Sequence, residues 1–301
     1  MNNIDLSSLP LPDSLQILDF EAELAALKAE LLTADPTLAA VLDLESEPLV
    51  KLLQVFAYRI LLKKGEINAK VKALLLAYAT GSDLDHLAAN IGVARLLIQV
   101  ANPAAGSSNN QQPTEAIYES NTALRRRVLL AAERDCAGSK GAYQYWALSA
   151  DGDVRDVSIV TPTAGVVEVY LQSRTATTAS QALLDTVATA LDSDTHRPFT
   201  DSVSVLAATP RDLQINATLT LFPGPDKAVV LANANAALDR YIQQVSYLGY
   251  DVTISGLHAA LHQAGVQRVE LLSPTQNIVI PASQYARVTS RDIAAVEYRD
   301  V

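Results

Sequence analysis

His258 and His262 are the residues whose types and spacing come nearest to a metal site. Four positions apart in a predicted helix, the two imidazoles would share one face, as in a zinc-binding helix. However, Ala259 stands where the metalloprotease pattern needs a glutamate as general base, and no third ligand is spaced to complete a site. We therefore interpret the two histidines as polar residues on a helix edge and expect no metal ion.

Three carboxylates, Asp151, Asp153 and Asp156, cluster around Gly152 and have the chemistry to bind calcium. An EF-hand loop places its glycine sixth and a bidentate glutamate twelfth, whereas the glycine here is second. Asp-Gly is also a common turn dipeptide. We interpret the cluster as a turn into the next strand.

The patterns of nucleophilic and phosphate-binding sites are incomplete. Residues 138–141 (Gly-Ser-Lys-Gly) are too few for a phosphate-binding loop, which needs four residues between its first glycine and its Gly-Lys pair. The nucleophile elbow and the dinucleotide-binding fingerprint do not occur. Cys136 is the single cysteine, so no intrachain disulfide can form, and we interpret it as a buried or incidental thiol. We expect a protein that is not an enzyme and that needs no cofactor.

Net charge and the distribution of apolar residues argue against nucleic acids and membranes as partners. The formal net charge of −10 repels the phosphates of nucleic acids and anionic membranes. The one basic run, residues 125–127 (Arg-Arg-Arg), is interpreted as a solvated or partner-facing helix surface. Residues 1–5 lack the basic start and apolar run of a signal peptide. No stretch reaches the ~18 consecutive apolar residues that a membrane-spanning helix needs. We expect a chain made in the cytoplasm, with no nucleic acid and no membrane among its partners.

Helices are expected up to about residue 100, because apolar residues recur there three and four positions apart. Pro48 suits a first helical turn because its missing N–H is not needed there. Gly65, Gly81 and Gly92 are expected helix ends. The predicted helices cover residues 15–32, 48–64, 66–78 and 82–90.

The second of these helices is apolar on nearly all sides. Over residues 49–62 only Lys51, Gln54 and Arg59 are not apolar, which is wider than the stripe that a surface helix needs. A domain of about 100 residues has limited protein to cover such a helix. It is either the centre of a self-contained bundle or a surface on which other chains pack, and the sequence leaves both alternatives open.

The pattern changes after a polar linker at residues 102–114 and a predicted helix at 115–134. Strands and helices then alternate. Strands are expected at 154–160, 166–171, 203–206, 213–222, 250–254, 266–271, 277–280 and 294–298, and helices at 180–191, 226–245 and 256–264. We therefore predict an α+β chain. It has a helical domain (1–101), the linker, a middle α+β domain (115–208) and a C-terminal α+β domain (209–301), the last two being short sheets with helices on one face.

Two segments resemble a known family. Residues 75–93 contain a helix, Gly81, the run Asp83-Leu84-Asp85 and a second helix, and residues 138–158 contain Gly141-Ala142-Tyr143 and the Asp-Gly turn. Residues 44–49 and the turn at 222–225 also match. Together with length and domain order, these segments make the chain similar to the baseplate J-like proteins of contractile-tailed phages and phage-tail-like bacteriocins.

The resemblance implies a structural baseplate wedge subunit without catalysis. Members of this family join partner wedge subunits through their N-terminal helices, contact neighbouring copies of themselves, and form a six-fold ring around the central hub or spike and the tail tube, next to the sheath initiator. Such a subunit is assembled in the cytoplasm of the bacterial host and ends in the tail baseplate. As a hypothesis, the partner interface comprises Leu49, Leu52, Leu53, Phe56, Ile60 and Leu61.

Two other functions remain as alternatives. Paired α+β domains on a helical domain also suit a small-molecule-binding regulatory module, which a saturable ligand would reveal. A hydrolase with a dispersed site would involve Cys136 and a histidine.

Overall fold

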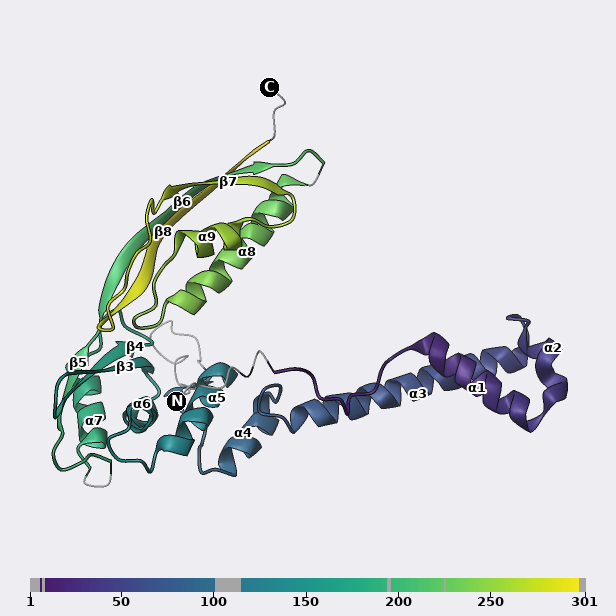
Figure 1. The fold of residues 1–301 in the computed structure, drawn as a ribbon, viewed down its shortest axis with the longest axis horizontal. Helices are drawn as coiled ribbons and strands as arrows, with labels where there is room; N and C mark the ends of the chain where they lie inside the picture. Colours follow the sequence, from purple (N-terminus) through teal and green to yellow (C-terminus); the bar gives the residue numbers. More distant parts are fainter. Residues whose placement is uncertain (1–5, 7–8, 101–114, 194–195, 225, 298–301) are drawn as a thin grey trace, which may run out of the picture. The chain divides into compact units, whose positions relative to one another are not determined.

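The structure is a computed structural model that describes residues 6, 9–100, 115–193, 196–224 and 226–297 (Figure 1). Its contacts divide the chain into two compact units. The helical unit comprises the described residues of Met1–Ala94 and Asn121–Arg125, and the sheet unit those of Arg95–Ser120 and Arg126–Val301. Helices followed by small mixed sheets confirm the predicted α+β class. The predicted linker, residues 102–114, lies outside the described residues.

In the helical unit, α1 (Phe20–Ala34) begins at a cap. The Asp19 carboxylate accepts hydrogen bonds from the backbone N–H groups of Glu21 and Ala22 at 3.0 and 3.1 Å, which satisfies amides that a helix start leaves free. The predicted start at Leu15 is wrong, because this cap determines where the helix begins. A 3₁₀ turn, η2 (Pro36–Leu38), and the short α2 (Ala39–Leu42) follow.

The helix α3 (Pro48–Ala73) is one helix of 26 residues where two were predicted. Gly65 lies inside it and does not end it, which corrects the expected break. An interior glycine costs only about 1 kcal/mol relative to alanine. Lys63 bonds Glu66 across the glycine at 2.8 Å, and Lys64 forms an ion pair with Glu23 of α1. Packing along the helix therefore outweighs the weak local preference.

The helix α4 (Gly81–Ala89) is close to its predicted range. Gly81 is its first residue and Gly92 lies just after its end, with φ angles of +55° and +73°. A side chain strains this backbone conformation, so glycine suits both positions. No helix in the described part of the chain is both long enough and apolar enough to cross a membrane.

The sheet unit opens with a short antiparallel ribbon, β1 (Leu97–Gln99) and β2 (Ile117–Tyr118). The helix predicted at 115–134 therefore starts too early. The buried Glu119 explains why: its carboxylate accepts from the Leu96 N–H, and its own N–H donates to the Leu96 carbonyl, both at 3.0 Å. This pairing overrides local helix preference. The helix α5 (Asn121–Leu130) and the turn η3 (Ala131–Glu133) follow.

The middle sheet has the strand order β3-β4-β5. The strands β3 (Val154–Thr163) and β4 (Val166–Ser173) form an antiparallel hairpin, and β5 (Ser202–Ala207) runs parallel to β4. The helices α6 (Lys140–Ala150), which was not predicted, and α7 (Gln181–Leu191) pack on each other and against the sheet.

The C-terminal sheet has the order β7-β6-β8. Its central strand β6 (Thr209–Leu221) is parallel to β8 (Gln284–Glu297) along its whole length and antiparallel to β7 (Val266–Ser273). The helices α8 (Lys227–Val245) and α9 (Ile254–Leu261) cover one face (Figure 1).

Three strand predictions in this domain need correction. Residues 250–254 and 277–280 form only a single bridge, Val252 with Ile278, and α9 already begins at Ile254. The last strand is longer than the predicted 294–298, because the parallel partner β6 is itself 13 residues long.

Candidate assembly interface

One side of α3 is buried against the rest of the helical unit. Val50 and Ala57, seven positions apart, are fully buried, and residues seven apart lie on nearly the same side of an α-helix. Leu24 of α1 is also buried, and α1 packs along α3. The Lys64–Glu23 ion pair lies at this contact. The inner side of α3 is therefore filled by its own chain.

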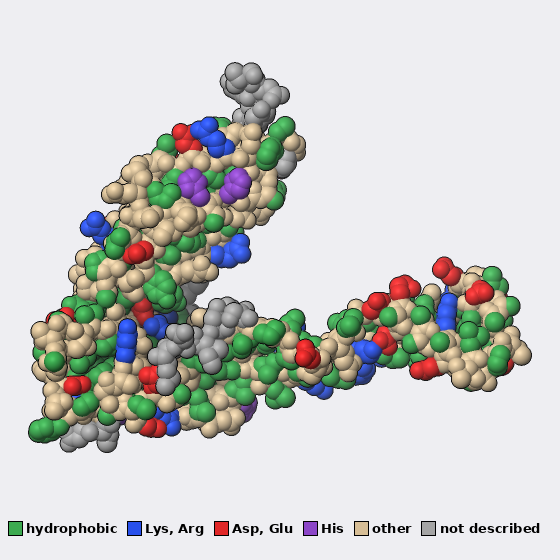
Figure 2. All heavy atoms as spheres, in the orientation of Figure 1, with side chains coloured by type: hydrophobic (Ala, Val, Ile, Leu, Met, Phe, Trp, Pro, Cys, Tyr) green, Lys and Arg blue, Asp and Glu red, His purple; other side chains and the backbone are tan. Residues whose placement is uncertain are grey.

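The opposite side of α3 leaves large apolar side chains in solvent. Leu52, Val55 and Phe56 are 51%, 58% and 52% exposed. Their spacing of three and four places them on one face of the helix. Tyr58 and Leu62 extend the exposed apolar surface along one edge. We call these five residues the outer α3 face. Exposed hydrophobic side chains are also visible on the surface of this unit in Figure 2.

The charged side chains of α3 itself, between residues 48 and 65, have one sign. Lys51, Arg59 and Lys63 are exposed on the same helix, and residues 48–65 contain no aspartate or glutamate. Lys63 bonds Glu66, the residue that directly follows this stretch. An apolar patch with a basic border suits a partner that is apolar at its centre and acidic at its edges.

The six residues expected at the partner interface separate into two groups. Leu52 and Phe56 belong to the outer α3 face. Leu49, Leu53, Ile60 and Leu61 are half-buried, because they lie nearer the side of α3 that its own chain covers.

Val55, Tyr58 and Leu62 were missing from the expected set although each, like Phe56, is about half exposed. Their apolar character is visible in the sequence. Selecting them requires knowing which side α1 covers, and the period of α3 alone does not contain that information. The exposed Ile17 and Leu18, before α1, were likewise not identified.

The consecutive arginines of α5 make specific internal contacts, and the expected solvated surface is wrong. Arg125 donates to the backbone carbonyls of Leu76 and Ala79 at 2.8 and 2.6 Å. Arg127 is 5% exposed and donates to the buried Glu119 carboxylate at 2.5 Å. The attraction within a buried ion pair offsets the cost of removing both charges from water only when the hydrogen-bond geometry is good, as it is for Arg127 and Glu119.

The carboxylates around Gly152 form the predicted turn. Asp151 accepts a hydrogen bond from the Asp153 N–H at 2.8 Å. Asp153 in turn accepts from the Ser173 hydroxyl at 2.7 Å and from the Thr175 N–H at 2.9 Å. These oxygens are occupied by groups of the fold, and the interpretation as a turn is confirmed.

Asp156 holds the middle and C-terminal sheets together. It is 3% exposed, pairs with Arg126 at 2.6 Å, and accepts from the backbone N–H of Leu248 at 2.8 Å. Nearby, the Gln172 side-chain amide donates to the Ser246 carbonyl at 3.1 Å. Burying the Asp156 carboxylate is tolerated because Arg126 and the Leu248 N–H bond it. The side-chain oxygen of Gln172 is buried without a hydrogen-bond partner among the described residues. We call this set the sheet joint.

Tyr143 of α6 anchors the middle domain core. Its side chain is buried, and its hydroxyl donates to the Asp201 carboxylate at 2.8 Å. Burial, and then this hydrogen bond, raise the pKa of Tyr143 well above the ordinary value for tyrosine. The neutral phenol is therefore the form that fits the fold.

The remaining residues with chemical potential lie apart. His258 is in α9 and His262 at its C-terminal end, while His196 stacks on Trp146 with ring centroids 3.6 Å apart. Cys136 is exposed, so the expectation of a buried thiol is wrong and that of an incidental thiol remains. Across the described residues, no three potential metal ligands come together.

Comparison with known proteins shows the family to which the chain belongs. Models of the baseplate J-like N-terminal, central and C-terminal domains match residues 45–102, 135–207 and 213–291. Baseplate protein J of Escherichia phage P2 is 43% identical over 288 residues, which are 93% of this chain and 94% of that protein. The chain belongs to the baseplate J-like family.

The family domains correspond to the structure in a simple way. The baseplate J-like N-terminal match contains α3, α4 and β1, the central match contains α6 to β5, and the C-terminal match contains most of the β7-β6-β8 sheet. The outer α3 face thus lies in the N-terminal domain of the family. A chain of the cryo-EM anti-feeding prophage baseplate is a distant structural likeness, with a TM-score of 0.36 and 17% identity over 65% of this chain and about half (48%) of that chain.

Proposed function

We propose that this baseplate J-like protein is a structural subunit of the baseplate of a contractile phage tail or tail-like bacteriocin. Family membership and the strong identity to baseplate protein J of phage P2 support the role. The residues with catalytic potential are scattered or bonded within the fold. A non-catalytic role is the function that these observations favour.

The outer α3 face carries the finer proposal that the protein is a wedge subunit. Leu52, Val55 and Phe56 are each about half exposed on a helix whose other side is filled. Burying such a surface against apolar helices of a partner is favourable by roughly 25 cal/mol for each Å² removed from water. We propose that helices of partner wedge subunits pack on this face, apolar at the centre and acidic at the border.

The complete assembly would be a ring of six wedges around the central hub and tube, with contacts between neighbouring copies and to the sheath initiator. The subunit would be assembled in the host cytoplasm and end in the tail baseplate.

The test is a gentle purification of the tagged chain from cells that produce it, followed by mass spectrometry and negative-stain electron microscopy. Co-purifying hub, sheath and other wedge proteins, with hexagonal plates or tail tips in the images, would support the proposal. A lone monomer or dimer without such companions would refute it.

A further inference from the structure

The central strand of the C-terminal sheet has a stretch of unpaired edge. Pairing between β6 and β7 stops at Asn216, opposite Ser273. The chain then turns away at Pro274, which is buried. The strand β6 continues in the other direction to Thr209, paired there only with β8. Its β7 side between residues 209 and 215 therefore has no strand partner among the described residues.

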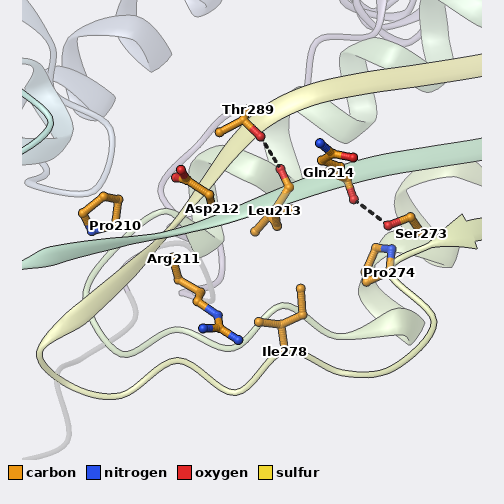
Figure 3. Close-up of a pocket in the computed structure, with 9 residues that line it drawn as sticks. All are labelled: Pro210, Arg211, Asp212, Leu213, Gln214, Ser273, Pro274, Ile278 and Thr289. Atoms are coloured by element: carbon orange, nitrogen blue, oxygen red, sulfur yellow. Dashed lines mark hydrogen bonds between the residues drawn. The ribbon is translucent and has the colours of Figure 1, made fainter.

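Two side-chain hydrogen bonds show which backbone groups point to this open side. The Thr289 hydroxyl of β8 donates to the Leu213 carbonyl at 3.2 Å, and the Ser273 hydroxyl of β7 donates to the Gln214 carbonyl at 3.1 Å (Figure 3). Successive residues of a strand direct their backbone groups to opposite sides. Asp212 therefore directs both its N–H and its carbonyl to the same side as Gln214, where β7 is missing.

A hollow of about 590 Å³ lies along this unpaired edge. Residues 210–214, Ser273, Pro274 and Ile278 are among its lining, and Figure 3 shows Arg211 and Ile278 facing each other across the space below β6. The five residues of β6 that line the hollow, 210–214, span roughly 17 Å at about 3.3 Å per residue. The space thus has the length of a short extended peptide.

The charge in the hollow is positive. Asp212 is neutralised by Arg287, whose guanidinium bonds both carboxylate oxygens at 2.6 and 2.7 Å. These bonds hold the pKa of Asp212 below its ordinary value. Arg211 is exposed, and the structure shows no hydrogen bond or ion pair for it with any described residue. A carboxylate on the occupant would pair with Arg211.

We propose that this hollow is a strand-addition site for an extended, acidic segment of a neighbouring baseplate protein. The segment pairs its backbone with the N–H and carbonyl of Asp212 and places a carboxylate at Arg211. Backbone pairing supplies the affinity, and the charge and the apolar contact at Ile278 supply the selectivity. The inference rests on the proposed baseplate role but concerns a different surface from the outer α3 face.

The first test compares Asp212→Pro with Asp212→Ala in assembled particles. Both variants lose the carboxylate, and only the proline variant also loses the N–H that points into the hollow. The amount of each variant relative to sheath protein is measured by quantitative mass spectrometry. We expect incorporation of Asp212→Pro to fall about tenfold below that of Asp212→Ala, with equal thermal midpoints for the isolated chains. Equal incorporation would overturn the proposal.

Hydrogen exchange at single-residue resolution gives a second measurement on the wild-type chain. In the free protein, the Leu213 amide, directed toward β8, should exchange slowly and the Asp212 amide quickly. In the assembled particle the Asp212 amide should slow at least tenfold. This result remains decisive even if the proline variant folds poorly. An Asp212 amide that exchanges equally fast in both states would refute strand addition.

Charge reversal at Arg211 tests the acidic partner. Arg211→Glu should reduce incorporation, whereas Arg211→Lys should retain most of it; equal behaviour of the two variants would refute the acidic segment. Failure of the wild-type chain to enter any particle would instead count against the baseplate role itself. The two failures are therefore distinguishable.

Discussion

Phe56→Asp is the sharpest perturbation of the outer α3 face. The wild-type side chain is 52% exposed. An aromatic side chain buries about 150–250 Å² when fully covered, so a partner would remove roughly 100 Å² of Phe56 from water. At about 25 cal/mol per Å², the loss of this burial costs about 2.5 kcal/mol. An aspartate at the centre of an apolar contact adds a desolvation cost of about 2 kcal/mol or more. The total corresponds to a weakening of association of at least about a thousandfold.

The assay is incorporation of the variant into tail particles, with the circular dichroism and thermal unfolding of the isolated chain measured in parallel. We expect folding to be retained, because half of Phe56 is already in solvent, and assembly to be blocked. Phe199→Asp is the matched control: it makes the same chemical change in the sheet unit at a phenylalanine that is fully exposed (103%), and it should assemble normally. Normal particle assembly by Phe56→Asp would refute the reasoning. Equal failure of both variants would show that the effect is not specific to α3.

Three further predictions test the fold that carries these surfaces. Asp156→Ala should lower the free energy of unfolding by about 3 kcal/mol, because it strands the buried donors of the sheet joint; urea unfolding measures this, and a change below about 1 kcal/mol would contradict it. Gly152→Ala would place a Cβ 2.3 Å from the Leu97 carbonyl oxygen and should destabilise by about 1–3 kcal/mol; the same change at Gly65, where nothing lies within 4 Å, is the control and should not destabilise. Because the pKa of Tyr143 is raised in the folded state, its stabilising effect is complete below the ordinary tyrosine pKa of about 10 and is lost as the pH rises above that value. The urea midpoint should therefore decline between about pH 9.5 and 11, and Tyr143→Phe should make this decline less steep. An unchanged slope in the variant would show that another group controls the decline.

The sheet joint bears on how the sheet unit acts in an assembly. The carboxylate of Asp156 on β3 bonds the backbone at Leu248, and Tyr285 of β8 donates to the Thr177 carbonyl after β4 at 2.6 Å. Hydrogen bonds at two separated points resist rotation between the sheets, whereas one would leave a hinge. We expect the two sheets to transmit force together.

The sequence by itself determined the elements whose signals are local. The cap residues Ser180 and Asp226 mark the starts of α7 and α8, and the side chain of each accepts from a backbone amide in the first turn. The Asp-Gly turn at 151–152 was readable for the same reason, since its hydrogen bonds join residues close in the chain. The apolar breadth of α3 was also visible, because it depends only on which residue types follow one another.

Only the tertiary structure decided which side of α3 is free. Phe56 and Ala57 are both apolar neighbours, yet one is half exposed and the other fully buried, since α1 lies along one side only. The contacts of the arginines in α5 and the hollow beside β6 were likewise decided only by the tertiary structure. Their roles depend on Glu119, Asp156 and the end of β7, whose positions are set by pairing across distant segments. Local helix preferences differ by only about 1 kcal/mol per residue between most residue types. Where they conflict with burial or with the pairing of distant segments, the larger free energy of these tertiary interactions decides the structure.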